Sequence, residues 1–296
     1  MTDLLGVMES WSAEVTEVRG EDGQVTEIRL ADIVSGKPVP PRASPRMRVS
    51  AEQACRLSNA SWPAVHTESL GEWLLRASGG FSARANSVMA TGDPGVPFAA
   101  ALERVRGFYA AHRLPAWAQV VVGSDAARGF EQHGWRSARP GEADSQFLLA
   151  TVAQAARAVR RLLPDSAPPV SVGTAATSAW LANDQRALAH REAAVAVLEG
   201  PDEVGFVSVG SPLLAKGRIS CDGDWAGITD VWVSPDHRRQ GLGVVVMAAM
   251  LDWAAERGAT TAYLQVRGDN VPGLRLYDRL GFRRHHAYRY LAAPDS

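Results

Sequence analysis

The segment from Val231 to Gly258 constrains the fold of this chain more than any other. It begins with β-branched and aromatic residues, as a strand does, and reaches Pro235, which the middle of a sheet does not accommodate. A turn containing Gly241 and Gly243 follows, and apolar residues then recur near helical spacing as far as Gly258, a typical C-terminal residue of a helix. A strand, a glycine turn and a helix N-terminus form an anion site, because unpaired N–H groups and the helix dipole point at the turn. The segment therefore predicts a phosphate-bearing ligand, which the two glycines let approach the backbone.

The turn differs from two common phosphate-binding motifs. A Walker A loop ends in Gly-Lys-Ser/Thr, and no lysine follows here. A dinucleotide-binding fingerprint has a third glycine, and Val246 stands in its place. We therefore expect this turn to bind neither ATP nor NAD.

Residues 238–243 read Arg-Arg-Gln-Gly-Leu-Gly. This resembles the acyl-CoA loop of the GNAT N-acetyltransferase superfamily, Arg/Gln-x-x-Gly-x-Gly/Ala after a strand, although an ordinary βα turn with a chance glycine pair is the alternative for the loop alone. Residues Ala262–Phe282 resemble the family's next strand, helix and Leu-Tyr-x-x-Leu-Gly-Phe ending, in the right order. The resemblance is specific over roughly Trp225–Tyr290. It implies an α/β (α+β) fold with a mixed, mostly antiparallel sheet flanked by helices.

The resemblance also implies roles for individual residues, with acetyl-CoA as co-substrate. The backbone of Val231, Trp232 and Val233 would bind the pantetheine arm and acyl group as an added strand would. The pyrophosphate would lie on Arg238, Arg239, Gln240, Gly241, Leu242, Gly243 and Val244. Asn270 matches the asparagine that bonds the pantetheine, and Tyr277 matches the general acid that protonates the CoA sulfur. A tyrosine pKa near ~10 keeps that proton at neutral pH; a ring that only packs in the core is the alternative for Tyr277.

The general base and metal ligands are less well defined by the sequence. Asp230 is the tentative base, with Asp222 and Asp224 on the preceding turn as further candidates and a solvated or ion-paired carboxylate as the alternative. His285 and His286 are adjacent, and neighbouring residues of a strand point to opposite faces, so we expect no shared metal ligation.

An internal repeat predicts a second GNAT-like half. Residues 118–136 align with residues 264–283 with one residue of slack. The alignment matches Gln119 with Gln265, Gly134 with Gly281, Trp135 with Phe282 and Phe130 with Tyr277. Because residues 84–114 contain no Arg/Gln-x-x-Gly-x-Gly pattern, this first half is expected to share the fold without the phosphate loop or the tyrosine hydroxyl.

Three domains follow from these patterns. We predict a small SH3- or Tudor-like β-barrel over residues 1–45, with a turn at Glu21–Gly23 and a stiff linker at Pro38–Pro41. A degenerate GNAT-like domain is predicted over residues 50–150, and a catalytic GNAT domain over residues 169–296. The remaining elements are predicted as helices over 51–62, 97–114, 151–163 and 177–200, and strands over 72–78 and 84–91.

Composition narrows the class of protein. The net charge of −1 gives no global field for nucleic acid, no apolar run approaches a bilayer span, and the N-terminus lacks the pattern of a signal peptide. Cys55 and Cys221 have no metal-type spacing and are expected to be free thiols in a reducing cytoplasm. We therefore expect a cytoplasmic N-acetyltransferase that acts on a small-molecule, amino-acid or protein amine by direct attack in a ternary complex, without a metal. An acetyl-CoA-binding sensor or interaction protein is the alternative, and a protein partner or a homodimer stays open.

Overall fold

The computed structural model describes residues 4, 6–20, 23–35 and 48–294, so the predicted Pro38–Pro41 linker and most of the Glu21–Gly23 turn lie outside the described residues. The chain divides into two compact units, Met1–Ala43 and Ser44–Ser296. The first unit contains an antiparallel three-stranded sheet of β1 (Gly6–Trp11), β2 (Val15–Gly20) and β3 (Val25–Arg29), in that order. Its Trp11 side chain is 61% exposed. The strands predicted here are present, and closure into a barrel is not seen in the described residues.

The second unit is built on one mixed sheet. Its strands in the described residues are β4 (His66–Leu70), β5 (Trp73–Ala77), β6 (Val88–Met89), β7 (Trp117–Val121), β8 (Arg136–Ser137), β9 (Ser145–Thr151), β10 (Val170–Gly173), β11 (Glu203–Val209), β12 (Ala215–Asp222), β13 (Trp225–Val233), β14 (Thr261–Arg267) and β15 (Arg283–Ala292). Their order is β10-β11-β12-β13-β14-β9-β15-β7-β6-β5-β4, with β8 paired to β15. Among these described pairs, β13 with β14 and β6 with β7 are parallel and the rest antiparallel. The predicted mixed, mostly antiparallel sheet is confirmed.

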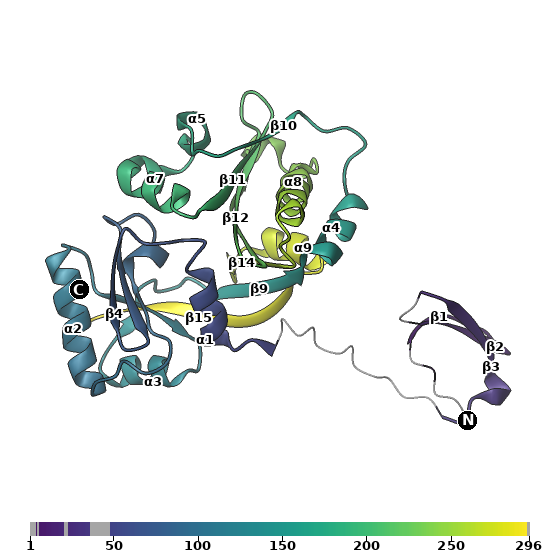
Figure 1. Ribbon diagram of the computed structural model, residues 1–296, viewed down its shortest axis with the longest axis horizontal. Helices are drawn as coiled ribbons and strands as arrows, with labels where there is room; N and C mark the ends of the chain where they lie inside the picture. The colour runs from purple at the N-terminus through teal and green to yellow at the C-terminus, as the bar shows by residue number, and fades with distance from the viewer. Residues whose placement is uncertain (1–3, 5, 21–22, 36–47, 295–296) are drawn as a thin grey trace. The chain divides into compact units, whose positions relative to one another are not determined.

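Helices cover both faces of this sheet (Figure 1). They are α1 (Ala51–Ser58), α2 (Phe98–Ala111), α3 (Asp125–Gln132), α4 (Val152–Arg160), α5 (Ser178–Leu181), α6 (Gln185–Ala189), α7 (Arg191–Glu199), α8 (Leu242–Glu256) and α9 (Val271–Arg279), with 3-10 turns η3 (Arg84–Asn86) and η4 (Pro235–His237). In the C-terminal half, α8 packs with α4 and α9 on one face, whereas α5, α6 and α7 belong to a separate core cluster with Phe206 of β11.

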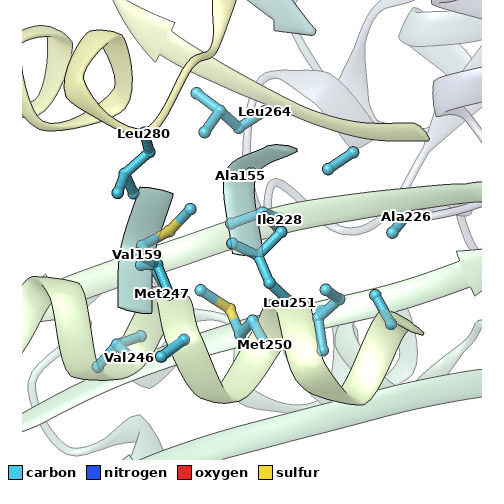
Figure 2. Packing of buried hydrophobic residues seen from close by; sticks show 14 of the residues in the cluster. Ala155, Val159, Ala226, Ile228, Val246, Met247, Met250, Leu251, Leu264 and Leu280 are labelled. Atoms are coloured by element: carbon cyan, nitrogen blue, oxygen red, sulfur yellow. The ribbon is translucent and has the colours of Figure 1, made fainter. Parts of the chain in front are cut away.

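The core of the C-terminal half explains why α8 is almost entirely apolar. Met247, Met250 and Leu251 lie between the sheet residues Ile228 and Leu264 and the neighbouring helices, as Figure 2 shows. All five side chains are at most 2% exposed. Burying such a side chain contributes about 1.5–3 kcal/mol, so the sheet and α4 fix α8 rigidly behind the glycine turn.

The two halves exchange their last strands. The parallel pair β13–β14 is followed in the sheet by β9, which ends the first half, and the parallel pair β6–β7 is followed by β15, which ends the second. The two strands also pair with each other, so the sheet is continuous. Neither half therefore completes its sheet from its own sequence.

Several predicted elements are corrected. Residues 84–91 form the η3 turn and the two-residue β6 rather than one strand, and residues 177–200 form three short helices rather than one. Strands β4, β9 and β10 were not predicted. Ser50 is the N-cap of α1, since its hydroxyl accepts from the Gln53 N–H at 3.0 Å. Among the described residues, no helix combines the length and apolar character needed to cross a bilayer.

Candidate active site

A cleft opens where the parallel strands β13 and β14 separate. Their pairing runs from Trp225 with Thr261 to Ile228 with Leu264 and then stops, although β13 stays paired to β12 and β14 to β9. The cleft has a volume of about 450 Å³ and is lined by Ile228, Thr229, Asp230, Val231, Leu264, Gln265, Val266, Arg267, Asp269, Asn270 and Tyr277. One edge of β13 beyond Ile228 is thus available to an extended ligand, as β-strand addition requires.

A bulge in β13 directs Asp230 into this cleft. Thr229 pairs with Arg218 and Trp232 with Lys216, so Asp230 and Val231 together stand opposite one residue of β12. Asp230 has a φ of 52°, which is uncommon for a non-glycine residue and typical of a β-bulge. Its Oδ2 atom is buried and accepts no hydrogen bond from the described residues. A buried, unpartnered carboxylate oxygen facing a cleft is chemically available to accept a proton.

The glycine loop has the geometry of an anion site. Arg239 and Gly241 have φ values of 62° and 81°, and Gly241 is the N-cap of α8 without a side-chain cap. Within the described residues, the N–H groups of residues 239–243 have no backbone acceptor, whereas those of Val244 and Val245 donate to the Gly241 carbonyl at 2.8 and 3.1 Å. Consecutive N–H groups in alternating backbone conformations form a concave nest for an anion at a helix N-terminus.

Asn270 and Tyr277 reach the cleft from α9. Asn270 is the N-cap of this helix, and its Oδ1 accepts from the Gly273 N–H at 3.1 Å. Tyr277 lies in the last turn of the helix, packs against Phe282 with ring centroids 6.1 Å apart, and is 8% exposed. Burial raises the pKa of Tyr277 to about 12. The ring is therefore part of the core, as in the alternative stated above, and the residue also lines the cleft.

The other predicted acids and imidazoles lie away from the cleft. Asp222 and Asp224 belong to the β12–β13 hairpin, where the Asp224 Oδ2 accepts from the Thr260 hydroxyl at 3.1 Å. The expectation that His285 and His286 point to opposite faces is wrong. A register shift between Arg284 and His286 lets their Nδ1 atoms approach to 2.8 Å. In the part of the chain that the structure describes, no three His, Cys, Asp or Glu residues are grouped to hold a metal.

The corresponding position of the first half is filled by aromatic rings. Phe130 is 0% exposed and lies 5.2 Å from Trp73, 5.3 Å from Phe98 and 4.7 Å from Trp135, measured between ring centroids. Phe130 and Tyr277 have equivalent places at the ends of α3 and α9. The Trp135 N–H donates to the Phe130 carbonyl at 3.1 Å, and the Phe282 N–H donates to the Tyr277 carbonyl at 3.0 Å.

The first-half loop before α2 also lacks donors. It contains Pro94 and Pro97, which have no N–H group, and the Gly95 N–H donates to the Asp93 carboxylate at 2.8 Å. A loop with missing donors and its own carboxylate is a poor phosphate site.

Four polar cleft residues were missed by the sequence patterns, Thr229, Gln265, Arg267 and Asp269, as were the apolar Ile228, Leu264 and Val266. Gln265 was singled out only as part of the repeat. The four polar residues lie on β13, on β14 or in the turn after β14, close in sequence to Asp230 or Asn270. Their closeness to these predicted residues is the sequence feature that could have indicated them. Cys55 and Cys221 are free and buried, as predicted.

Comparison with known proteins agrees with this architecture. The family model described as "Probable histone acetyltransferase Rv0428c C-terminal" matches residues 50–291. An uncharacterized N-acetyltransferase of Bacillus subtilis, YobR, is 27% identical over 79% of this chain and 96% of its own length. The Mycobacterium tuberculosis protein named as the probable histone acetyltransferase Rv0428c is 26% identical over 100% of this chain and 90% of its own length. A tandem GNAT protein from the clavulanic acid biosynthesis pathway superposes with a TM-score of 0.54 at 14% identity, covering 71% of this chain and 76% of that one, so the fold is shared.

Proposed function

This chain belongs to the GNAT superfamily, in the family of the Rv0428c acetyltransferase C-terminal domain, and from that premise we propose that it transfers the acetyl group of acetyl-CoA to an amine by direct attack in a ternary complex. The observation that carries the proposal is the separation of β13 from β14. It leaves a strand edge and a tyrosine side chain at one cleft of about 450 Å³, and the N–H nest of residues 239–243 follows the same strand in the chain.

The residues suit the parts of acetyl-CoA in order along β13 and the loop that follows it. The N–H groups of residues 239–243 suit the pyrophosphate, and the exposed Arg238 and Arg239 add positive charge next to it. The unpaired edge of Val231–Val233 suits the pantetheine amides, and Asn270 lies across the cleft from it. We propose that these contacts hold the thioester carbonyl between Asp230 and Tyr277.

The proposed chemistry needs three proton transfers. Asp230 would accept the first proton from the acceptor ammonium, so that a neutral amine attacks the thioester carbonyl and the C–S bond breaks. The Tyr277 hydroxyl would donate a proton to the departing thiolate, and the attacking nitrogen would lose its second proton to solvent, from which Tyr277 is reprotonated.

Titration with acetyl-CoA is expected to give one site per chain, with no binding of ATP or NAD. The reason is that the first-half loop lacks the donors of residues 239–243 and its cleft is filled around Phe130. Isothermal calorimetry with the three ligands measures both points. Two equivalent sites per chain would contradict the degenerate first half, and NAD binding without a CoA signal would contradict the assignment of the loop.

Replacing Asp230 by Asn is expected to lower kcat/KM for the amine by about 10²- to 10⁴-fold near neutral pH, because the variant cannot take the ammonium proton. The deficit should shrink as the pH rises, since solvent then deprotonates a growing fraction of the amine. Steady-state rates across pH for wild type and variant measure this ratio, with Asp224→Asn as the control on the same hairpin. A deficit that stays constant with pH would assign Asp230 a structural role in the bulge.

The acceptor class is the remaining part of the proposal. The name of the M. tuberculosis relative refers to histones, so lysine-bearing peptides belong in a panel with amino acids and small amines. CoA release monitored across this panel tests the function. Acetyl-CoA binding without release with any amine would favour a sensor instead.

A further inference from the structure

Two arginines behind the lining residues of the cleft contact one aromatic ring and form no ion pair with a described carboxylate. The guanidinium carbon of Arg84, in η3 of the first half, lies 5.0 Å from the ring centroid of Trp62, and that of Arg218, on β12 of the second half, lies 5.4 Å from it. Neither arginine forms an ion pair with any acid in the described part of the chain. Buried cations are normally paired, because removing a charge from water without compensation is costly.

Arg218 is only partly satisfied. It is 0% exposed, and its Nε and Nη1 atoms donate to the carbonyls of Leu198 and Ser61 at 2.8 and 3.0 Å. Nη1 also lies 3.3 Å from the hydroxyl oxygen of Thr229, which lines the cleft. Nη2 is buried and has no acceptor among the described residues. Burial lowers the pKa of Arg218 to about 10, so the guanidinium remains charged at neutral pH.

Arg84, which belongs to the first half, is connected to the cleft lining through the side chain of Tyr288. Its Nε is buried and donates to no described residue. Burial lowers the pKa of Arg84, and the neighbouring hydroxyls of Tyr288, Tyr290 and Tyr263 raise it by more. The Tyr288 hydroxyl in turn donates to the Gln265 Oε1 at 2.6 Å, and Gln265 lines the cleft. No carboxylate is thus among the described groups around this guanidinium.

The charge balance around this position is positive. Lys216 and Arg186 interact electrostatically with the same groups, which makes four cations with Arg84 and Arg218, and the carboxylates among them are Asp184 and Asp230. Asp184 is already paired with Arg186 at 3.0 Å. Lys216 donates to the Trp180 carbonyl at 2.6 Å, which does not compensate its charge. Asp230 therefore stands at the edge of a region with more positive than negative charge.

We propose that the acceptor amine carries an anionic group, a carboxylate or a phosphate, that binds between Arg84 and Arg218 while its ammonium faces Asp230. This inference rests on the proposed function and specifies its substrate class. Guanidinium groups bind carboxylates and phosphates through paired N–H donors, and these two arginines have donors unused. The nearby Asp230 gives the site opposite charges for the two ends of a zwitterion, as in a free amino acid.

The test compares matched acceptors with and without the negative charge. The carboxylate arm uses α-amino acids and their carboxamides, and the phosphate arm uses O-phosphoethanolamine and ethanolamine. Both CoA release and calorimetric binding of the N-acetylated acid or amide to the CoA complex are measured. In at least one pair, the anionic acceptor is expected to exceed the neutral one roughly 10- to 100-fold in rate and affinity. This ratio corresponds to one hydrogen bond to a charged group, which the neutral acceptor cannot form.

Arg84→Met is expected to reduce this ratio towards one, because it keeps an aliphatic side chain on Trp62 and removes the charge. Arg84→Lys should retain part of the ratio, and Arg104→Met, on the exposed face of α2, should retain all of it. CoA binding in the same titrations shows that each variant is folded.

Equal rates and affinities for the anionic and the neutral acceptor in both pairs would overturn the inference. An unchanged ratio between them in Arg84→Met would also overturn it. Turnover of neutral amines alone would leave the proposed function standing without it. A binding preference for the anionic ligand without acetyl transfer to any amine would support the anion site and contradict the proposed function.

Discussion

Replacing Tyr277 by Phe is expected to lower kcat by about 10²- to 10⁴-fold while acetyl-CoA affinity changes little. The hydroxyl is needed mainly when the thiolate leaves, so its loss affects the reaction more than ground-state binding. The substitution keeps the ring, which packs against Phe282, and so preserves the core of α9. Single-turnover and steady-state rates, together with calorimetric acetyl-CoA binding, separate the two effects.

The pKa of Tyr277 adds a condition to this result. Burial raises it to about 12, so the hydroxyl keeps its proton below that value and can act as a donor throughout the neutral range. The wild-type kcat should therefore show no fall attributable to Tyr277 as the pH rises from 7 towards that value. Undiminished turnover in Tyr277→Phe would remove the residue from the mechanism and leave water or another donor to protonate the sulfur.

Phe130→Tyr is the matched control for this position. Phe130 occupies the equivalent place in the first half, but it is enclosed by Trp73, Phe98 and Trp135 and lacks a donor loop before α2. A hydroxyl there should restore no activity to Tyr277→Phe and add no second acetyl-CoA site. Partial rescue would mean that the first half still binds the co-substrate.

Replacing Gly241 by Val is expected to lower acetyl-CoA affinity roughly 10- to 100-fold, the value of one or more lost N–H bonds to a phosphate. Gly241 has a φ of 81°, which a β-branched residue adopts only with strain of about 1–3 kcal/mol, so the loop would leave its anion-binding conformation.

Gly243→Val should also weaken acetyl-CoA binding, although the φ of Gly243 is unstrained. A Cβ there would meet the Leu276 Cδ2 at 3.3 Å and crowd the space between α9 and Val233. Calorimetry gives the affinities.

The control for strain is at the other end of the same helix. Gly258 has a φ of 77°, and a Cβ at this position meets no atom within 4 Å. Gly258→Val should therefore lower the melting temperature as Gly241→Val does, while acetyl-CoA affinity stays at the wild-type value. If the variants at Gly241 and Gly243 bind acetyl-CoA like the wild type, the phosphate lies elsewhere.

The strained residues show how local sequence and site geometry are connected. Among the described residues, non-glycine positive φ angles occur at Ser82, Arg113, Asp230 and Arg239, and the last two belong to the candidate site. Such angles persist only where the surroundings enforce them and are common at binding sites. The glycine motif indicated the turn, but the bulge at Asp230 depends on pairing with β12 and could not be predicted from residues 225–233 alone.

The sequence by itself determined what depends on short-range interactions. The turn at Gly241, the cap at Ser50 and the glycine that ends α9 are each encoded within a few residues, so their patterns could be interpreted directly. The repeat was detectable for the same reason, since both halves end a helix with the same glycine and aromatic residue.

Only the tertiary structure decided which distant segments meet. The exchange of β9 and β15, the separation of β13 from β14, and the position of Arg84 beside Arg218 on Trp62 each join residues far apart in the chain. Strand pairing is stabilised by side-chain packing across neighbouring strands, which no single strand specifies. The chain therefore encodes the glycine turn locally, whereas the cleft and its proposed acceptor side exist only once both halves have folded onto one sheet.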